Sequence, residues 1–538
     1  MKKLTLILFC FFYASNVFAQ MAQSLLIDPK ALSLGNAVTA DPPGLASIHY
    51  NPAGLTKLEG RQLSVTLFNV ILQTGAEYSL PDGYATDENG NEVDPGLLDF
   101  RDDPVVGQEG EAAPGLYAPK IGIVPLHLPV ATLPGGGISV NPPGSKFTFA
   151  TMSYMAMAGV LVKEDDDPGR YQGKQVGMQR LTYLSPSFGY KVNDEFSVGF
   201  GVLLSHQAFA ISQDVRAVNI LMAAGEMVQE AFGCEEGGGG SDPLVPFISM
   251  CGGRIGPYRD IGNLSMQLEK SMSFTYHMGV LWEPNDWFAW GASYQSEAKD
   301  ELTGEFEFDY SRDFSGFFSG FRGSIFGAIV GAMFQLPTGV SKETGYVATE
   351  FTYPQHFQTG FKFRFMDKLQ FNVDAGWTDY DEWESFKFEF DRQLDFLNAA
   401  KILAPTEVTA TSLEQRLDYK SHWNFGFGLE YQLSSRLKAR LGYEPRSSSI
   451  PDGQRNVMAP FGEANIYAVG FGYQWDLDTV VDVSLSFMKS EEEILASDPS
   501  GSLNTDCLTC VAANPYPGLD VKTYLSVAAA GITFRTKF

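Results

Sequence analysis

The feature that most constrains this chain is a two-residue alternation of large apolar side chains with small or polar ones, which returns repeatedly after residue 180. In residues 184–192 every second side chain is Leu, Pro, Phe, Tyr or Val, and Ser, Gly and Lys stand between them. A turn at 193–195 follows, and residues 196–204 resume the alternation. Because successive side chains of a strand point to opposite faces, the pattern predicts antiparallel hairpins joined by tight turns and separated by longer polar loops.

The same hairpin unit occurs several times along the chain. Four further pairs are residues 274–282 with 288–294, 357–365 with 371–377, 423–433 with 437–443, and 467–475 with 481–487. Single alternating segments lie at residues 63–71, 121–128, 147–161 and 524–538. All these segments together make fourteen strands, an even count that closes a barrel with both chain ends on the same side.

The strand face opposite the large apolar side chains distinguishes a membrane barrel from a soluble β-sandwich. That face carries mostly Gly, Ser, Ala, Asn and Gln, and few of the Lys and Glu residues typical of a sheet exposed to water. Tryptophans stand at segment ends, where a membrane barrel has its aromatic girdles: Trp282, Trp287, Trp377, Trp423 and Trp475. The last strand ends on Phe538, a terminal aromatic typical of barrel assembly. The sequence therefore predicts an all-β, antiparallel transmembrane β-barrel of fourteen strands.

Residues 1–19 have the features of a secretory signal peptide. Lys2 and Lys3 precede an apolar run at 4–13, and Val17 and Ala19 supply the small residues that a signal peptidase reads. The remaining chain has no uncharged apolar stretch of about 18 residues, the least that a membrane-spanning helix needs. We therefore expect the mature chain to be exported to the outer membrane of a Gram-negative cell.

Charge and cysteine content exclude other classes of protein. The full chain has 64 acidic and 38 basic residues, which argues against a nucleic-acid partner. After cleavage the cysteines form two close pairs, Cys234 with Cys251 and Cys507 with Cys510. In an exported protein such pairs predict local disulfides rather than a zinc site, so neither a metal nor a cofactor is expected.

Residues 20–60, between the signal peptide and the first strand, show no alternation. They contain Leu34-Gly35-Asn36-Ala37 and Tyr50-Asn51-Pro52-Ala53-Gly54-Leu55. This segment resembles the N-terminal hatch of the FadL family of outer-membrane transporters, with its Asn-Pro-Ala motif. The resemblance implies that residues 20–60 plug a fourteen-stranded barrel formed by residues 61–538. It also implies that a hydrophobic ligand binds above the hatch and leaves sideways through a gap in the wall.

Other stretches resemble the same family, at residues 185–202, 294–297, 377–383, 440–443 and 450–451. The chain departs from the family pattern at 460–462, where Pro-Phe-Gly stands instead of the usual Pro-Asp. The resemblance implies passive import of long-chain hydrophobic compounds, either fatty acids or hydrocarbons. The expected partners are therefore such a hydrophobic small molecule, outer-membrane lipid and lipopolysaccharide, and the expected state is a monomer.

The two longest loops lie at residues 205–273 and 297–356, on the side opposite the tight turns. The resemblance implies that these third and fourth outer loops form the groove that first captures ligand. The fourth carries a run of large apolar side chains: Phe314, Phe317, Phe318, Phe321, Phe326, Ile329, Val330, Met333 and Phe334. They either pack within the loop or form a capture surface, with Phe318, Phe321 and Phe326 as candidates. Glycines at 323, 327 and 331 recur every four residues and suit a close helix contact.

Two side chains are candidates for binding an anionic head group. Counting from the turn at 434–436 places Arg440 opposite Glu430, where the two charges neutralise each other. The same count places Lys420 and His422 on the lumen side, with no acid opposite Lys420. The resemblance puts Lys420 where family members have a basic residue associated with the ligand carboxylate. A lysine that is simply solvated is the other interpretation.

Residues 147–159 are apolar on both faces, unlike the other strands. Met155 and Met157 supply flexible apolar surface suited to variable ligands, so both are candidate ligand contacts. Ala156, Ala158 and Gly159 are small enough to let the strand bend and open the wall. The hypothesis is a lateral exit at this strand, and the alternative is packing of its side chains against the hatch.

Other functions find less support in the sequence. A barrel enzyme such as a phospholipase or protease needs a nucleophile oriented by a base, and the six histidines show no such constellation. Ser205 and His206 are adjacent in a strand and point to opposite faces. A TonB-dependent receptor needs a larger plug and more strands. A general porin is the remaining alternative, although the N-terminal plug argues against an open pore.

Overall fold

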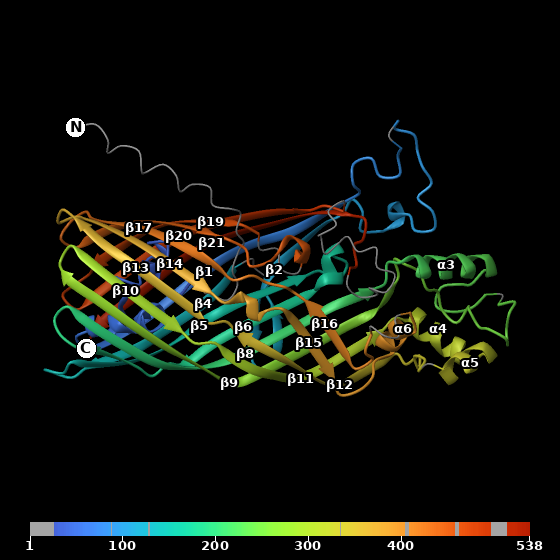
Figure 1. Cartoon of the computed structure of the whole chain (residues 1–538), viewed down its shortest axis with the longest axis horizontal. Helices are drawn as coiled ribbons and strands as arrows, with labels where there is room; N and C mark the ends of the chain where they lie inside the picture. Colours follow the sequence, from blue (N-terminus) through green and yellow to red (C-terminus); the bar gives the residue numbers. More distant parts are fainter. Residues whose placement is uncertain are drawn as a thin grey trace, which may run out of the picture.

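The computed structural model describes residues 26–87, 89–126, 130–240, 242–333, 335–403, 408–457, 462–496 and 514–538. Its strands form one antiparallel sheet that closes on itself, because the first strand pairs with the last. Figure 1 shows the barrel with its axis horizontal, the tight turns and the C-terminus at one end, and the helices of the long loops at the other. The expected antiparallel barrel is confirmed.

The strands extend well beyond the alternating segments of the sequence. They are β1 (Gly60–Ser79), β2 (Glu109–Ala118), β3 (Gly122–Pro125), β4 (Val130–Asn141), β5 (Phe147–Lys163), β6 (Gln175–Leu184), β7 (Ser187–Lys191), β8 (Phe196–Arg216), β9 (Asp260–Asn285), β10 (Phe288–Gln295), β11 (Ala298–Tyr310), β12 (Lys342–Tyr353), β13 (His356–Phe365), β14 (Leu369–Thr378), β15 (Ser385–Phe390), β16 (Ser412–Arg416), β17 (His422–Gln432), β18 (Leu437–Arg446), β19 (Ala464–Gln474), β20 (Thr479–Ile494) and β21 (Asp520–Lys537).

These segments occupy fourteen positions around the wall, as expected. Five positions hold two consecutive segments each: β6 with β7, β10 with β11, β12 with β13, β14 with β15, and β16 with β17. β2 and β4 share the second position, because both pair with β1 and with β5. The second strand expected at 121–128 is wrong, since Gly122–Pro125 pair with β2 in a separate hairpin. That hairpin also has one packed face, so its side chains alternate like those of a wall strand.

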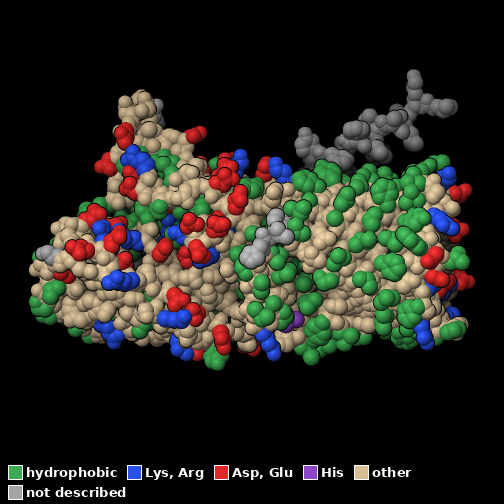
Figure 2. Space-filling model, turned by 180° about the vertical axis from the view of Figure 1, so that it is seen from behind, with side chains coloured by type: hydrophobic (Ala, Val, Ile, Leu, Met, Phe, Trp, Pro, Cys, Tyr) green, Lys and Arg blue, Asp and Glu red, His purple; other side chains and the backbone are tan. Residues whose placement is uncertain are grey.

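One end of the barrel carries a continuous apolar belt on its outer surface. Figure 2 shows this belt in green, with charged side chains beyond both of its edges. Its exposed members include Val65, Leu67, Ile71, Phe149, Phe274, Phe425, Leu441, Val469, Leu485 and Phe534. Trp282, Trp287, Trp423 and Trp475 are exposed at strand ends, as an aromatic girdle requires. The belt is therefore the surface that faces lipid.

The hatch fills the lumen at the level of the belt. Its described part, residues 26–59, includes the short helices α1 (Pro29–Leu32), α2 (Ser47–Tyr50) and η2 (Pro52–Lys57). Asn51 is fully buried, and its amide donates to the backbone oxygens of Thr39 (2.8 Å) and Val280 (2.9 Å). Its Oδ1 accepts from the backbone N–H of Ala53 (3.1 Å). Asn51 thus caps η2 and ties the hatch to β9.

Glycines on the inner face of the wall leave no room for a side chain, so the hatch packs directly on the backbone of the strands. A Cβ on Gly279 would lie 2.0 Å from Asn51 Oδ1, and one on Gly199 would lie 2.1 Å from the carbonyl carbon of Pro52. Glycines of β17, β18 and β19 meet hatch residues 33–37 in the same way: Gly426, Gly428, Gly442 and Gly470. The small-residue face of these strands therefore docks the hatch instead of lining a water-filled channel.

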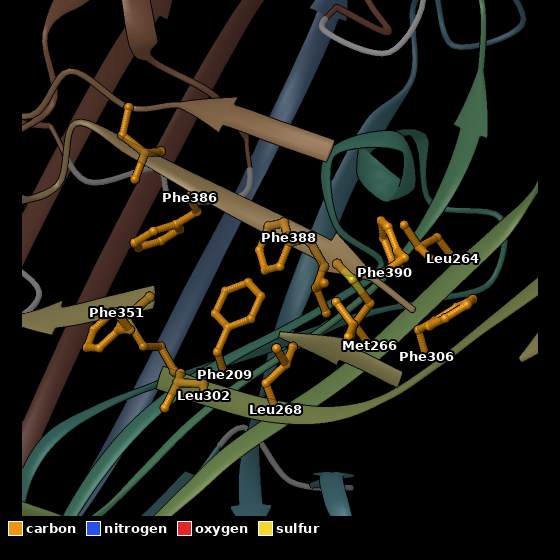
Figure 3. Close-up of a cluster of buried hydrophobic side chains, with 14 of the residues drawn as sticks. Phe209, Leu264, Met266, Leu268, Leu302, Phe306, Phe351, Phe386, Phe388 and Phe390 are labelled. Carbon is orange, nitrogen blue, oxygen red and sulfur yellow. The ribbon is translucent and has the colours of Figure 1, made fainter. Parts of the chain in front are cut away.

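The outer half of the lumen holds a large apolar core, here called the upper core. Phe209 of β8 lies 5.5 Å from Phe388 and 6.1 Å from Phe386 of β15 between ring centroids, so well-separated strands share one cluster. Figure 3 shows these rings among the apolar side chains that point toward them. Met157 and Met178 belong to the same core. Burial of an unpaired ion in such an interior is unfavourable.

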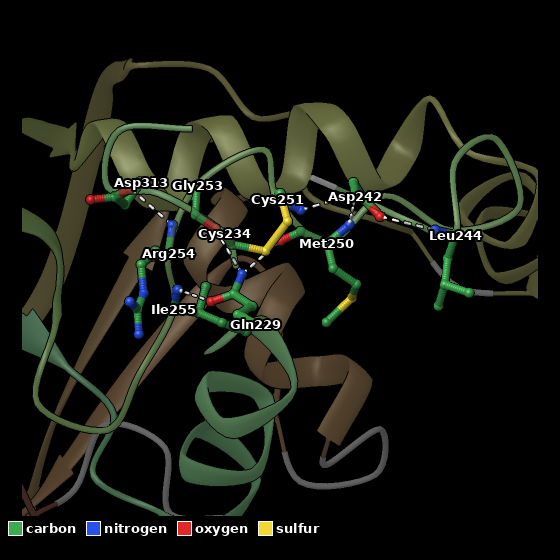
Figure 4. Close-up of a disulfide and its surroundings, with 10 residues drawn as sticks. All are labelled: Gln229, Cys234, Asp242, Leu244, Met250, Cys251, Gly253, Arg254, Ile255 and Asp313. Carbon is green, nitrogen blue, oxygen red and sulfur yellow. Dashed lines mark hydrogen bonds between the residues drawn. A yellow bond between two sulfur atoms is a disulfide. The ribbon is translucent and has the colours of Figure 1, made fainter. Parts of the chain in front are cut away.

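The third and fourth outer loops pack on each other beyond the upper core. The third holds α3 (Ile220–Phe232) and a disulfide between Cys234 and Cys251, whose Cα atoms lie 4.9 Å apart (Figure 4). The fourth holds α4 (Arg312–Arg322) and α5 (Ile325–Met333), and the next loop holds α6 (Asp395–Leu403). Within the described chain, no single helix has the length and hydropathy to cross a membrane; α4 and α5 reach them only as a pair bent by 91°. Cys507 and Cys510 lie outside the described residues.

The close helix contact expected at 323, 327 and 331 forms mainly at other glycines. A Cβ on Gly316 of α4 would lie 2.2 Å from the backbone oxygen of Gly252, beside the disulfide. Gly327 alone of the expected three makes a close helix contact, 1.9 Å from the backbone oxygen of Phe321 at the bend between α4 and α5. Gly323 and Gly331 have their nearest neighbours at 3.4 Å. α4 docks on the third loop through the face that carries Gly316. The four-residue spacing of glycines at 323, 327 and 331 does not identify this face.

Candidate functional site

The lower part of β5 joins the hatch to the wall. Met152, Tyr154 and Ala156 are buried in one cluster with Ile48 of the hatch. Tyr154 Oη lies 3.3 Å from His49 Nδ1, also in the hatch. Met157, one residue beyond Ala156, belongs to the upper core instead. The boundary between hatch and upper core therefore falls within β5.

A polar shelf lies in the lumen at this boundary. Arg180 of β6 is 1% exposed and donates to Ser273 Oγ (2.8 Å) and Gln207 Oε1 (3.2 Å). Its guanidinium carbon lies 4.4 Å from the ring centroid of Tyr353, and its Nη1 lies 3.9 Å from Asp300 Oδ2. A buried cation with so loose an ion pair costs several kcal/mol, so Arg180, between an apolar core and a plug, is a candidate functional residue.

Four polar atoms of this region are buried without a hydrogen-bond partner among the described residues: Arg180 Nη2, Gln207 Nε2, Gln295 Nε2 and Asp300 Oδ2. Each unpaired buried group costs about 1–3 kcal/mol, and most proteins pair them. Three of the four atoms are nitrogen donors. A ligand group with acceptor oxygens, such as a carboxylate, would satisfy them.

The wall is interrupted beside the shelf. β4 pairs with β5 over Gly136–Val140, and β2 pairs with β5 over Ala112–Pro114. Between these ladders, Val130–Gly135 of β4 and Tyr154–Val160 of β5 form no ladder with each other, in this described part of the chain. This interruption is termed the slit. Met157, on its edge, pairs with Arg180, so the slit adjoins the shelf.

The slit opens toward the apolar belt. Leu67 and Ile71 of β1, which pair with Pro134 and Val130 of β4, are 37% and 46% exposed on the outer surface. Lipid that contacts these side chains therefore also reaches the edge of the slit.

Two local features weaken the ladder between β4 and β5. Pro134 has no backbone N–H to donate to a neighbouring strand. β5 has a bulge between Met155 and Met157, which makes Ala156 an extra residue. Ala158 is exposed and Gly159 is half-buried beyond this bulge. The methionines and small residues singled out in the sequence therefore all lie on one edge of the slit.

Lys420 does not reach the shelf. It is exposed and precedes β17, and its backbone N–H donates to the backbone oxygen of Ser449 (2.9 Å). His422 is buried and stacks on Tyr380, with ring centroids 5.8 Å apart. The expectation that both side chains face the lumen together stays a prediction, because Lys420 lies between β16 and β17, outside the strand whose alternation was extended to it.

Sequence reasoning identified one lumen arginine and missed another. Arg440 contacts Glu430 (2.8 Å) as expected, and it also contacts Asp482 (2.5 Å). Arg180 stands in β6, and its partners come from β8, β9 and β11, strands that it does not reach through a tight turn. One signal in the sequence could have identified Arg180. It is the only charged residue at positions 175–184, and no acidic residue lies beside it in that segment.

The apolar run of the fourth loop divides into an inner and an outer part. Phe314 and Phe317 are buried, and the ring of Phe318, which is half-buried, lies 4.8 Å from that of Phe314. Phe321 is half-buried, and Phe326 is 39% exposed. The inner rings therefore pack within the loop, and the outer ones meet water; the capture surface stays a prediction.

Comparison with known proteins agrees with this architecture. A family model described as outer membrane protein transport protein (OMPP1/FadL/TodX) matches residues 14–538. The fold is similar to that of a FadL homologue of Pseudomonas aeruginosa, with a TM-score of 0.64 and 16% identity, over 97% of this chain and 100% of that one. It is also similar to the toluene transporter TodX of P. putida, with a TM-score of 0.58 and 12% identity, over 96% of this chain and 99% of that one.

The toluene transporter TbuX of Ralstonia pickettii is another similar structure, with a TM-score of 0.56 and 14% identity, over 96% of this chain and 99% of that one. No curated protein sequence matches the chain. At these identities the solved structures show the fold alone. The family model, in contrast, matches nearly the whole chain and shows the family. This protein therefore belongs to the OMPP1/FadL/TodX family of outer-membrane transport proteins for hydrophobic compounds, and it is a transporter rather than an enzyme.

Proposed function

We propose that this chain imports long-chain hydrophobic compounds passively, by capture at the outer loops, passage through the upper core and release sideways through the slit. The observation that carries the proposal is the position of the slit, which interrupts the wall where the upper core meets the hatch. A plug below and a break in the wall beside it favour a sideways path over a straight one.

Capture begins on apolar side chains at the outer end of the third and fourth loops. Val245, Phe247, Ile325, Ile329 and Met333 are 56%, 56%, 52%, 53% and 69% exposed. Such a patch binds apolar compounds because binding removes apolar surface from water. The buried side of α4 belongs to the upper core, so the patch is continuous with the lumen.

The shelf favours an amphiphile with a long chain over a small hydrocarbon. Its three unpaired donors suit the oxygens of a carboxylate, and the upper core accommodates the alkyl chain. Exposure of one methylene to water costs about 0.8 kcal/mol. Release of the chain directly into lipid avoids this cost. No energy source is needed, since a downstream enzyme that consumes the compound maintains the gradient.

Obstruction of the slit tests the route. We expect Gly159→Ile to lower the initial uptake rate of a radiolabelled long-chain fatty acid about tenfold, because a bulky side chain at the edge adds about 1.4 kcal/mol to the passage. Ala530→Ile, at an outward position of β21, is the matched control and leaves uptake unchanged. Unchanged uptake with Gly159→Ile, at normal barrel levels in the outer membrane, contradicts the lateral route.

A substitution at Arg180 tests the substrate class. We expect Arg180→Gln to raise the half-saturation concentration for the fatty acid about tenfold, the loss of one charge-assisted contact. Uptake of the alkane of equal length is unaffected, because an alkane has no group for the guanidinium. Arg61→Gln, an exposed arginine of β1, is the control. Since TodX and TbuX are toluene transporters, uptake of labelled toluene without uptake of fatty acid contradicts the proposal.

A further inference from the structure

A hairpin rooted at the upper end of the slit leaves the wall. β2 departs after Pro114, pairs with β3 through Gly115–Ala118, and the chain re-enters the wall at Val130. Figure 1 shows β2 running across the barrel axis. Ile123 of the hairpin packs near Val160 of β5 and Gly177 of β6.

The hairpin lies on the outside of the barrel. Tyr117 packs with Ala208 and Ala210 of β8. These alanines flank Phe209, which points into the upper core. Because neighbours along a strand point to opposite faces, Tyr117 covers the outer face of β8.

One carboxylate holds the hairpin in place. Glu269 Oε1 accepts from Tyr117 Oη (2.6 Å) and from the backbone N–H of Lys120 (2.7 Å), both in the hairpin. On the barrel side, Gln267 Nε2 donates to the same oxygen (3.1 Å), and His206 Nε2 lies 3.1 Å from Oε2. Hydrogen bonds to a carboxylate are roughly twice as strong as neutral ones, so Glu269 is a firm polar anchor of the hairpin on β9.

Along β1, the hairpin is an excursion from an otherwise continuous strand. Ala112 faces Thr74, and Val130 faces Ile71. The two β1 residues between those partners are matched by the two residues that follow Ala112. The described residues 115–126 are therefore additional to a strand that is complete without them.

The two edges of the slit match each other as well. Six residues of β4, Val130–Gly135, face seven of β5, Tyr154–Val160, and the bulge at Ala156 accounts for the extra one. Unpaired N–H and C=O groups cost several kcal/mol each in lipid. Because the edges of β4 and β5 are in register, we expect them to form a ladder unless another part of the structure holds them apart.

We propose that the docked hairpin holds the slit open, and that Glu269 is the positioning residue that keeps the hairpin docked. Both legs of the hairpin leave the wall at the upper end of the slit, and docking over Val160 draws them outward across β5. Release from Glu269 lets Val130–Gly135 pair with β5 and seals the wall. The consequence for transport rests on the proposed lateral route, whereas the change in the wall does not.

Disulfide trapping in the full-length protein tests the device. Thr132 and Ala158 face each other only when the edges are paired. We expect little cross-link with Thr132→Cys and Ala158→Cys alone, and at least about a tenfold higher yield after Glu269→Ala, measured by mass spectrometry of unreduced peptides. Val469→Cys with Leu485→Cys, a ladder pair of β19 and β20, cross-links equally in both backgrounds. Glu305→Ala, beside the hairpin tip, is the matched control and leaves the yield low.

Equal cross-linking with and without Glu269→Ala overturns the proposal, whether both yields are low or both are high. Tyr117→Phe removes one hydrogen bond with little disturbance of the fold, and we expect an intermediate yield. A variant whose unheated barrel migrates like the unaltered protein in gel electrophoresis is folded, and only the cross-link yields of folded variants are compared. If Glu269→Ala raises the yield while fatty acid uptake is unchanged, the hairpin device stands and the lateral route fails.

Discussion

Deletion of residues 20–59 is expected to convert a nearly non-conducting protein into an ion-conducting pore in planar lipid bilayers. The described part of this segment fills the lumen at the level of the apolar belt, and β1 begins after it. Barrels of 16–18 strands leave an aqueous channel and barrels of 8 are filled by their own side chains, so a fourteen-stranded wall lined with glycine leaves open space once its plug is gone.

The full-length protein, refolded and inserted in the same way, is the control for this measurement and conducts little. The deletion also removes the floor on which Met152, Tyr154 and Ala156 pack, so the upper core loses its support. Equal conductance of the two proteins contradicts the plug and means that the upper core seals the lumen by itself. A large conductance of the full-length protein instead supports a general porin.

A second large effect is expected from Gly279→Val, which attacks the docking of the hatch without shortening the chain. The new Cβ would lie 2.0 Å from Asn51 Oδ1 and 2.9 Å from Pro52 Cδ. Asn51 Oδ1 is held by the hydrogen bonds of its amide group and Pro52 Cδ by its ring, so the hatch has to move. Overpacking of this kind costs about 1–3 kcal/mol, which raises the undocked population of the hatch about 5- to 150-fold.

Backbone amide exchange of residues 33–57 measures this change, with bilayer conductance as a second reading. Valine is favourable in β-strands, so the substitution does not weaken β9 itself. Faster amide exchange in the hatch therefore reports a loss of hatch docking. Gly376→Val is the matched control on the inner face of β14, because the atom nearest to its new Cβ is Cε1 of His356 in the wall, at 3.1 Å, rather than an atom of the hatch. Unchanged exchange with Gly279→Val refutes the role of the glycines in docking.

Several parts of the site were readable from the sequence because they are local. Asn51, Pro52 and Ala53 sit in a non-alternating segment before a strand, and the structure makes Asn51 the cap that ties the hatch to β9. The small residues Ala156 and Gly159 stood out in a strand that is apolar on both faces, and they lie on the edge of the slit.

Other parts could not be read because they depend on partners far away in the chain. Arg180 makes its contacts with Gln207, Ser273 and Asp300, which belong to three different strands. Lys420 was placed by extending the register of β17 beyond its first residue, His422, into the segment between β16 and β17. Register within a hairpin is fixed by its turn, but beyond the strand nothing local fixes it.

The sequence by itself determined the barrel, the number of its strands and the presence of a plug, because period-two alternation and tight turns are local properties of the chain. Only the tertiary structure decided that Gly115–Ala118 of β2 and all of β3 leave the wall and that Val130–Gly135 stay unpaired from β5. It also decided that a buried arginine lies beside that break. These features arise when the sheet closes, because closure brings the outer face of β9 to Tyr117 and the lumen side of β6 to Asp300, pairs that no local pattern links.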